Sequence, residues 1–392
     1  MTASDLARHY ARFRVGERVL LTGHSHQAWP DVAFGAQQRA WLDAAEHVDE
    51  QWALAAEMAE RARQGWRRLL GEGAGLIALG QSTHELVLRF LSALPLGERS
   101  RLVTTDAEFH TLRRQLDRLG EVGLEVVKVP GRPVATAAER VAARVDGRTA
   151  AALVSSVYYA TAEIVPHLEA VARACRRHGA ELLVDAYHHL NVVPFDLAGM
   201  ALEDAFVTGG GYKYSQLGEG NAFLRVPPGR EGLRPVITGW FAEFGELAAG
   251  ERPEAVVYAG GEARWAGATY DPTSHYRAAA VFPFFQEMGL TPARLREISQ
   301  RQVGMLAEAC RRAPLEGRVR LVGLEGAGSL AGVGGFLALE LDDAAGVQRL
   351  LRERGVLTDH RGDVLRLGPA PYLRDDQLEE ALGHLGEVVV RG

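Results

Sequence analysis

The stretch that decides the fold is LLVDAYHH, residues 182–189. Three apolar residues followed by an acid are typical of a buried strand whose carboxyl end carries a polar side chain, here Asp185. Other short apolar runs lie on both sides of this stretch and alternate with helical patterns. This alternation predicts an α/β domain with a mostly parallel sheet and right-handed crossovers.

The expected elements divide the chain into two folded regions. Strands expected in the first region are short apolar runs at 101–105, 124–129, 151–157, 181–185, 205–208 and 222–226. The helices around them have apolar positions three or four residues apart and cover 34–70, 83–94, 111–119, 136–145 and 166–178. From about residue 277 the pattern becomes helices 277–288, 291–312, 343–354 and 375–389, with strands near 318–323, 334–341 and 363–367.

We therefore expect a large domain and a smaller α+β domain at the C-terminal end. The expected boundaries are 1–33 for an N-terminal segment that joins the small domain, and 34–265 for the large domain. Residues 266–392 would form a connector and the small domain, because the Gly- and Pro-containing stretch 259–275 is typical of a hinge.

The composition excludes several classes of protein. The 392 residues carry a formal net charge of −6, and their 44 lysines and arginines are spread along the chain, so no basic surface for nucleic acid is expected. The first 14 residues lack the apolar core of a secretory signal, and no apolar run approaches the ~20 residues that span a bilayer. Two cysteines, Cys175 and Cys310, are too few for a disulfide framework. A cytoplasmic protein without a membrane partner fits these features.

Ligands of open α/β sheets bind beyond the carboxyl ends of the strands, so the polar residues found there are the candidates. Ser82 and Thr83 open the helix after an apolar run, where free backbone N–H groups can hold a phosphate. The same residues could be a plain helix cap. Phe109 follows another strand and could stack on a flat ring, although a loop aromatic is more often only packed.

The two strongest candidates are an acid and a lysine. The apolar neighbours of Asp185 place it toward the sheet interior. A buried carboxylate needs a cationic partner, and a ligand could supply one. The alternative role for Asp185 is a helix cap or a salt bridge at the end of the sheet. Lys213 lies in TGGGYKY, residues 208–214, where three glycines leave room for a close ligand. Burial would lower its pKa and make it a nucleophile, whereas a surface lysine in a flexible loop is the alternative. His188 could reach the same cavity or be a bystander.

These four strand-end sites, at Ser82 and Thr83, Phe109, Asp185 and Lys213, are explained better by one bound cofactor than by four unrelated roles. An acid for a protonated pyridine nitrogen, a lysine for an imine, a phosphate-binding turn and a stacking aromatic are what pyridoxal 5′-phosphate (PLP) requires. These four sites would rarely occur in this order along the chain by chance. We therefore expect PLP as an imine on Lys213, with Asp185 keeping the ring an electron sink.

The quoted motifs also resemble those of a known family. The strand serine Ser155, the D-x-x-H of Asp185 to His188 and the Y-K-Y around Lys213 follow the order found in kynureninase-like members of the class V aminotransferase superfamily. The resemblance runs over nearly the whole chain. It implies a fold-type I PLP-dependent transferase, with a mostly parallel seven-stranded-type sheet flanked by helices and a smaller α+β C-terminal domain. It also implies a homodimer with active sites near the subunit boundary.

The resemblance assigns roles to individual residues. Tyr212 would contact the phosphate and act as an acid, beside Lys213 as the imine-forming residue and Asp185 at the ring nitrogen. The expected cofactor-binding residues are Ser82, Thr83, Phe109, Ser155, Asp185, His188, Tyr212, Lys213, Trp240, Thr269 and Asp271. Trp240 lies in a G-W-F motif, and the segment 269–272 would reach the cofactor of the neighbouring subunit.

The C-terminal region carries the clue to the substrate. Residues 365–372, LRLGPAPY, resemble the family stretch I-R-x-x-P-x-P-L, in which the arginine binds the α-carboxylate of the substrate. Arg366 would have this role, because a guanidinium makes two parallel bonds to a carboxylate. An arginine on a solvent-facing strand is the alternative. Gly362 and Asp363 would form a turn before this strand.

Three departures from the family pattern concern the substrate and leave the cofactor residues in place. The family's G-N-S-L-G stands here as GHSHQ at 23–27, and its F-P-S-D stands as FHTL at 109–112, without the acid. The asparagine that helps the family to read the kynurenine ring is replaced near Asp271.

The leading functional hypothesis is a kynureninase-like hydrolysis of an α-amino acid. In such a reaction Lys213 removes the Cα proton, water attacks a γ-carbonyl, and Tyr212 assists proton transfer while the Cβ–Cγ bond breaks. The products would be alanine and an aromatic acid such as anthranilate. Transamination or another lyase reaction on the same scaffold is the main alternative. Desulfuration of cysteine fits less well, because Cys310 lies in a helical pattern. A protein that binds a ligand without turnover is a further alternative.

A metal site is not expected. The histidine pairs His24-x-His26 and His188-His189 lack a cysteine or acid at a ligand-like spacing.

Overall fold

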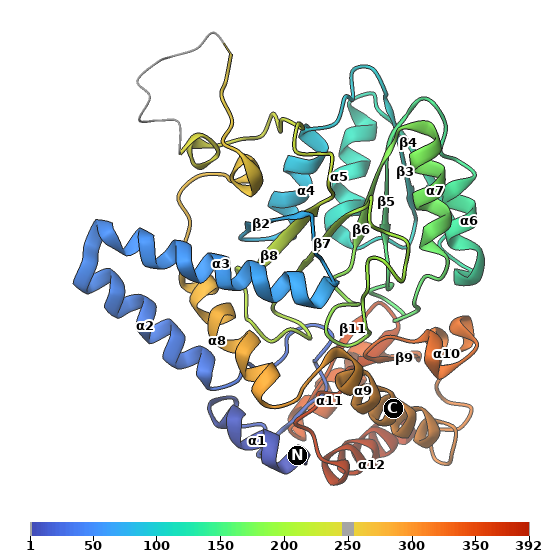
Figure 1. The fold of residues 1–392 in the computed structure, drawn as a ribbon. Helices are drawn as coiled ribbons and strands as arrows, with labels where there is room; N and C mark the ends of the chain where they lie inside the picture. Colours follow the sequence, from blue (N-terminus) through green and yellow to red (C-terminus); the bar gives the residue numbers. More distant parts are fainter. Residues whose placement is uncertain (1, 245–254, 392) are drawn as a thin grey trace.

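The centre of the molecule is one seven-stranded sheet. The computed structural model describes residues 2–244 and 255–391 (Figure 1). The strands are β2 (Leu76–Gly80), β3 (Arg101–Thr105), β4 (Glu125–Val129), β5 (Thr149–Ser155), β6 (Glu181–Asp185), β7 (Phe206–Gly210) and β8 (Ala222–Val226). Their order is β2-β8-β7-β6-β5-β3-β4, and β8 runs antiparallel to both neighbours while the other pairs are parallel. The expected mostly parallel sheet is confirmed.

Helices cover both faces of this sheet, as Figure 1 shows. Alternate strand residues point to opposite faces: Leu183 packs in the cluster with α4 and α5, while Val184 packs in the larger cluster on the other face. The flanking helices are α3 (Gln51–Leu70), α4 (Thr83–Ser92), α5 (His110–Glu121), α6 (Ala137–Ala142) and α7 (Leu168–His178). Burial on both faces explains why the strands are continuous apolar runs in the sequence.

The single helix expected over 34–70 is wrong. Two helices, α2 (Val32–His47) and α3, are separated by a short 3₁₀ turn at Val48–Glu50. Val48 has a φ of 48°, a conformation that β-branched residues rarely adopt, and neither glycine nor proline marks the break. Both helices pack against α8 (Thr273–Glu287), and Tyr276 on α8 donates a hydrogen bond to Asp43. Tertiary packing therefore sets this turn.

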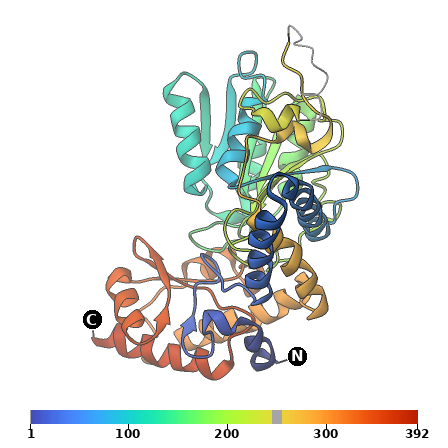
Figure 2. The same ribbon diagram turned by 90° about the vertical axis from the view of Figure 1, so that its left-hand side faces the viewer.

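The C-terminal part forms the second layer of structure, which lies below the large sheet in Figure 2. Its three-stranded antiparallel sheet has the order β11-β12-β9, formed by β9 (Leu337–Glu340), β11 (Asp359–Arg361) and β12 (Val364–Leu367). Gly362, with a φ of 55°, makes the expected turn between β11 and β12. The helices are α9 (Pro292–Cys310), α10 (Val322–Ala327), α11 (Ala344–Glu353) and α12 (Asp375–Arg391).

A strand expected near 318–323 is also wrong. The chain makes only an isolated bridge between Arg320 and Glu340 and then forms α10. Leu321 and Leu324 are both buried, three residues apart, so the apolar run serves one face of a short helix.

The N-terminal segment lies against the C-terminal part. After α1 (Ala3–Ala7), strand β1 (Val19–Leu20) pairs in parallel with β10 (Val356–Leu357), and Thr22 bridges to Gly368. Figure 2 shows this blue segment beside the red C-terminal elements. The residues that follow Thr22 are thereby brought to the edge of the large sheet where the candidate site lies. Within the described ranges, none of the helices has the length and apolar character that crossing a bilayer requires.

Candidate active site

The carboxyl ends of three neighbouring strands bring the polar residues together. In the sheet register Ser155 lies opposite Asp185, and Asp185 lies opposite Thr208. Asp185 is 8% exposed, and its Oδ1 accepts a hydrogen bond from the backbone N–H of Tyr187 at 2.9 Å. Burial raises the pKa of this carboxyl, while the backbone hydrogen bond and the charge of Lys213 oppose the rise. The acid is therefore held in a place where a cation would stabilise its charged form.

Lys213, which follows β7, is buried at the same edge of the sheet. It is 5% exposed, and its Nζ lies 2.6 Å from Nε2 of His188. Burial lowers the pKa of the lysine to about 7, and the charge of Asp185 acts in the opposite direction. Burial also lowers the pKa of His188 well below its usual value, so this imidazole is neutral. Its Nδ1 has no hydrogen-bond partner among the described residues. Since each charge acts on the other, Asp185 and Lys213 belong to one site.

Aromatic rings surround the amine. The Nζ of Lys213 lies 4.5 Å from the ring centroid of Tyr187, 5.3 Å from that of Phe109 and 5.6 Å from that of Tyr212. His26, from the N-terminal segment, stacks on Tyr212 with centroids 5.0 Å apart. Tyr187 was missed by the sequence reasoning, although it lies inside the D-x-x-H motif. Phe109 and Tyr187 come from different strand ends, so the amine has an aromatic ring from each.

The three glycines before Lys213 do not leave space for a ligand, which corrects the sequence interpretation. A Cβ atom on Gly210 would lie 2.4 Å from the hydroxyl of Tyr187, and one on Gly211 would lie 2.7 Å from Leu217. Neither glycine has a positive φ. Their role is to let neighbouring side chains, Tyr187 among them, pack directly against the backbone.

The N-terminus of α4 has the expected hydroxyl residues. Ser82 caps the helix by accepting the N–H of Glu85 at 3.3 Å, and Thr83 is the first helical residue. N–H groups of the first turn have no partner within a helix, so they are available to an anion. The carboxylate of Glu85, which the sequence reasoning did not consider, accepts the N–H of Gln81 at 2.9 Å and pairs with Arg89. The cap is therefore confirmed, and a neutralised acid lies beside it.

Glu108 is a second buried acid at the strand ends, and the sequence alone assigned it no role. It is 1% exposed, and it accepts the hydroxyl protons of Thr105 at 2.7 Å and of Ser155 at 2.6 Å. Burial raises the pKa of Glu108 to about 7, against the effect of these hydrogen bonds. Ser155, expected to bind a cofactor, uses its hydroxyl proton on Glu108 in this structure.

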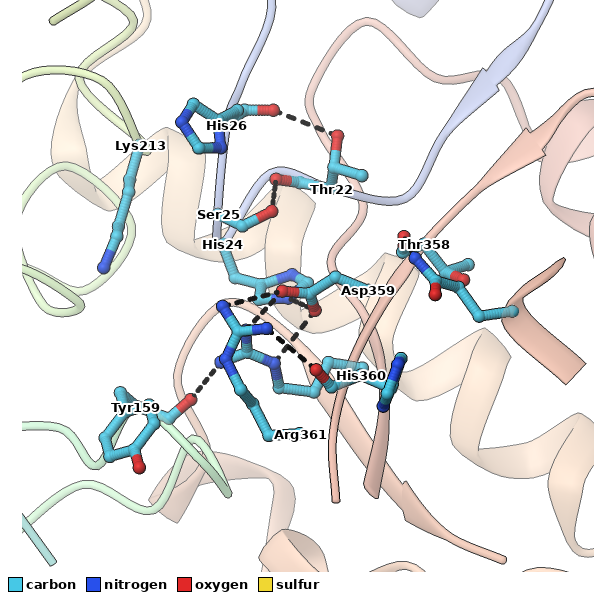
Figure 3. Close-up of polar contacts among 12 residues, drawn as sticks. Thr22, His24, Ser25, His26, Tyr159, Lys213, Thr358, Asp359, His360 and Arg361 are labelled. Atoms are coloured by element: carbon cyan, nitrogen blue, oxygen red, sulfur yellow. Dashed lines mark hydrogen bonds and ion pairs between the residues drawn. The ribbon is translucent and has the colours of Figure 1, made fainter. Parts of the chain in front are cut away.

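The β11–β12 hairpin supplies Arg366. Nε of this arginine donates to Oδ1 of Asp359 at 2.9 Å, a second nitrogen pairs with Oδ2, and Nη1 donates to the carbonyl of Tyr159 at 2.5 Å. Asp359 and Arg366 are direct partners across the hairpin. His24 completes the group, with Nε2 2.6 Å from Oδ1 of Asp359 (Figure 3). Arg366 is therefore a buried arginine with a partner, which corrects the alternative of a solvent-facing side chain.

Near neutral pH, the charges of His24 and Asp359 beside the β11–β12 hairpin do not change with pH. Burial lowers the pKa of His24 to about 4, so the ring is neutral and donates its Nε2 proton to Asp359. Burial alone would raise the pKa of Asp359, but the hydrogen bonds and charges of His24 and Arg366 hold it well below its usual range. His24 stood in the quoted GHSHQ stretch, but nothing in the sequence pairs it with Asp359, which lies 335 residues further along the chain.

Two of the expected cofactor residues line one cavity of this chain, and the third, Asp271, is not among its lining residues. Trp240 and Thr269 line a cavity of about 470 Å³, together with Arg89 and several aromatic side chains. Lys213 and Asp185 do not line it. Asp271 accepts the N–H of Thr273 at 2.9 Å and so begins α8. Gly80 and Gln81, next to the N-terminus of α4, also line this cavity.

The histidine pairs are dispersed over different partners. His26 lies 3.6 Å from Glu219, and His189 lies 3.1 Å from the carbonyl of Pro194, whereas His24 and His188 contact Asp359 and Lys213. In residues 2–244 and 255–391 no group of three His, Cys, Asp or Glu side chains is arranged to hold a metal ion.

Comparison with known proteins identifies the fold. No family model matches the sequence. An uncharacterized aminotransferase, YcbU, of Bacillus subtilis (strain 168) is 24% identical over 338 residues, which cover 85% of each chain. A C-DES mutant with glycine covalently linked to its PLP cofactor has a TM-score of 0.83 at 16% identity, over 97% of this chain and 98% of that one.

Two cysteine desulfurases have similar structures. The apo enzyme of Thermococcus onnurineus NA1 has a TM-score of 0.82 at 16% identity, over 100% of this chain and 99% of that one. CsdA of Escherichia coli has a TM-score of 0.80 at 14% identity, over the same shares. The chain therefore has the α/β fold of fold-type I PLP enzymes, and the expected fold class is confirmed.

Proposed function

We propose that this chain is a PLP-dependent enzyme of the class V aminotransferase type, that it acts on an α-amino acid, and that Lys213 carries the cofactor. One observation supports this more than any other: a buried lysine with a pKa of about 7 and a buried acid, Asp185, act on each other's charge at one edge of the sheet. Fold similarity to PLP enzymes and 24% identity to an aminotransferase support the same assignment.

The side chains present fit PLP. Asp185 accepts a backbone N–H and has a raised pKa, so a protonated ring nitrogen would stabilise its charge. Phe109 and Tyr187 offer aromatic faces beside Lys213. Ser82 and Thr83 at the N-terminus of α4 would hold the phosphate. When bound, PLP supplies an electron sink for bonds at the substrate Cα.

The protein's own groups would then move the protons. An amine with a pKa of about 7 both accepts and returns a proton near neutral pH, so Lys213 Nζ suits the exchange at Cα. Burial raises the pKa of Tyr212, so its phenol keeps its proton and can serve as an acid. Neutral His188, 2.6 Å from Lys213, orients the amine. Arg366 would bind the α-carboxylate of the substrate.

Different observations favour different reactions on this scaffold. The D-x-x-H and Y-K-Y motifs favour a kynureninase-like hydrolysis, and identity to YcbU favours transamination. Desulfuration that needs a thiol of the enzyme is disfavoured, because Cys175 and Cys310 are buried and burial raises the pKa of both thiols to about 12. By resemblance, we also propose a homodimer, in which Trp240, Thr269 and Asp271 lie near the partner's cofactor.

The test is to add PLP to the purified chain and to its Lys213→Ala variant. We expect a visible absorbance band that borohydride fixes covalently in the wild type and that Lys213→Ala lacks. A peptide map after reduction should then carry the cofactor mass on Lys213. A wild type without this band would contradict the proposal.

The same preparation separates the finer reactions. Incubation with kynurenine should release anthranilate and alanine if the hydrolase hypothesis is right. Incubation of amino donors with pyruvate or 2-oxoglutarate should release a new amino acid if the enzyme is an aminotransferase. Anthranilate formation without dependence on Lys213 would contradict the hydrolase hypothesis.

A further inference from the structure

Two arginines and one carboxylate share a corner of the candidate active site. Arg366 contacts both oxygens of Asp359, and Nη2 of Arg361 lies 3.6 Å from Oδ2 of the same carboxylate. Nη1 of Arg361 also donates to the carbonyl of His360 at 2.8 Å. Figure 3 shows Arg361 next to Asp359, with Lys213 across the site. Asp359 therefore has two positively charged neighbours.

The two arginines differ in their access to solvent. The side chain of Arg366 is 3% exposed, whereas that of Arg361 is 47% exposed. Asp359 and Arg361 are two residues apart on β11, so they share one face of the hairpin. The side chain of Arg361 is therefore accessible from solvent, whereas that of Arg366 is enclosed.

Arg361 also acts on the site electrostatically. Burial is the main cause of the low pKa of Lys213; Asp185 opposes it, and Arg366 and Arg361 add to it. The charge of Arg361 acts in the same direction on His188. These effects agree with a guanidinium that lies near enough to Lys213 and His188 to act on their charge.

The charges of this corner are not balanced. His24 is neutral, so two guanidinium charges face the single charge of Asp359 and one positive charge is left over. Arg366 is already paired through two of its nitrogens. The bond from Nη1 to Tyr159 fixes a third nitrogen. The uncompensated charge therefore lies on the exposed arginine.

We propose that Arg361 and Arg366 together bind the substrate's carboxylate, and that Asp359 is a positioning residue that holds Arg366 and leaves the pair one positive charge. This inference rests on the proposed function, because it concerns the substrate of the same site. It narrows the substrate class to α-amino acids with one carboxylate and an uncharged side chain. Amines without a carboxylate lack the charge that the pair binds, and dicarboxylates bring one charge too many.

The test measures binding of three small molecules to the PLP-loaded protein, through the change of its visible absorbance. L-2-Aminobutyrate has one carboxylate, propylamine lacks it, and L-aspartate has a second one in place of the methyl group. We expect the wild type to bind L-2-aminobutyrate most tightly. Arg361→Gln should raise its half-saturating concentration about tenfold and leave that of propylamine nearly unchanged, since one charge-assisted contact is lost. Arg361→Lys should restore part of the affinity, because it keeps the charge.

Two further variants sharpen the result. Asp359→Asn leaves both arginine charges uncompensated, so binding of L-aspartate should improve relative to L-2-aminobutyrate. Arg349→Gln, at an exposed arginine of α11, is the control and should leave all three affinities unchanged. Equal loss of affinity for propylamine and L-2-aminobutyrate in Arg361→Gln would overturn the inference, as would no loss at all. Absence of a Lys213-dependent band in the wild type would instead overturn the proposed function, and this inference with it.

Discussion

The candidate site has two halves, the strand ends and the β11–β12 hairpin, and they shift the pKa values of their acids in opposite directions. At the strand ends, burial raises the pKa of Asp185 and Glu108 and lowers that of Lys213 to about 7. In the β11–β12 hairpin, the pKa of Asp359 is held well below its usual range by His24 and Arg366. The carboxyls of Asp185 and Glu108 are more deeply buried than that of Asp359, whose side chain is 16% exposed. Asp359 also has two direct partners, His24 and Arg366, so both burial and pairing distinguish the two halves.

This contrast has a physical reason. A buried ionisable group without a strong partner of opposite charge avoids ionisation, whereas a carboxylate paired through two bonds with a guanidinium stays ionised. The strand-end half can therefore exchange protons near neutral pH, which proton transfer at a substrate requires. The hairpin half keeps a fixed charge, which suits recognition of an ionised group. Each half can be tested by removing one of its acids.

The largest effect is expected for Asp185→Asn. Asparagine can still accept the N–H of Tyr187, but it cannot carry the charge that a protonated ring nitrogen needs. We expect turnover to fall about 10²- to 10³-fold, the range found when one buried electrostatic contact to developing charge is removed. The pKa of Lys213 should fall further, because the charge of Asp185 raises it. Turnover and the pH dependence of PLP binding measure the two effects.

This interpretation of the lost turnover requires that the Asp185→Asn variant still folds. The thermal midpoint of the apo Asp185→Asn variant should stay close to that of the wild type, since the shape and the backbone hydrogen bond are kept. Turnover within threefold of the wild type would contradict the role of Asp185 and remove the contrast between the two halves.

The next effect in size is expected for Asp359→Asn. The change leaves buried Arg366 without its carboxylate, which should lower the free energy of unfolding by about 3 kcal/mol. Because the folded pKa of Asp359 is depressed, its contribution is present above the unfolded value of about 3.8 and is lost as the pH falls. The stability of the wild type and of the variant should thus converge in acid. Denaturant unfolding at pH 7 and below pH 4 measures this.

Asp376→Asn is the matched control for this change. Asp376 pairs with Arg374 through the same two-bond geometry, both at 2.9 Å, but on the exposed surface. Solvent screens such a pair, so the control should leave the unfolding free energy nearly unchanged. Equal effects of the two substitutions would show that the hairpin pair is not electrostatically special.

The sequence predicted the strand-end half much better than the hairpin half. Asp185 and Lys213 each end or follow a strand of the same parallel sheet, and the carboxyl ends of such strands must lie along one edge. Their meeting therefore follows from the pattern alone. Phe109 and His188 were found in the same way, as neighbours of strand ends. The parallel sheet itself was readable from its continuous apolar runs.

The hairpin half depends on packing that no local pattern encodes. His24 meets Asp359 because β1 pairs with β10 and carries the N-terminal segment to the hairpin. That pairing joins two-residue strands, which are too short for a periodic signal. The break at Val48 between α2 and α3 is hidden for a similar reason, since packing on α8 decides it. Tyr187 was missed because it occupies an unspecified position (x) of the D-x-x-H motif, where the motif predicts no residue type.

The smallest effect is expected for Glu108→Gln, which tests whether the strand-end half titrates near neutral pH. The folded pKa of Glu108 is about 7 against an ordinary value of 4.5, so the protonated form favours folding, and this advantage is lost as the pH rises through 7. Between pH 5 and pH 8 the wild type should lose about 2 kcal/mol of unfolding free energy relative to the variant, which has no such proton. The amide oxygen of glutamine can still accept from Thr105 or Ser155, so the comparison concerns the proton more than the contacts. Parallel stability profiles over this pH range would mean that Glu108 is ionised throughout, and the contrast between the two halves would then rest on Asp185 and Lys213 alone.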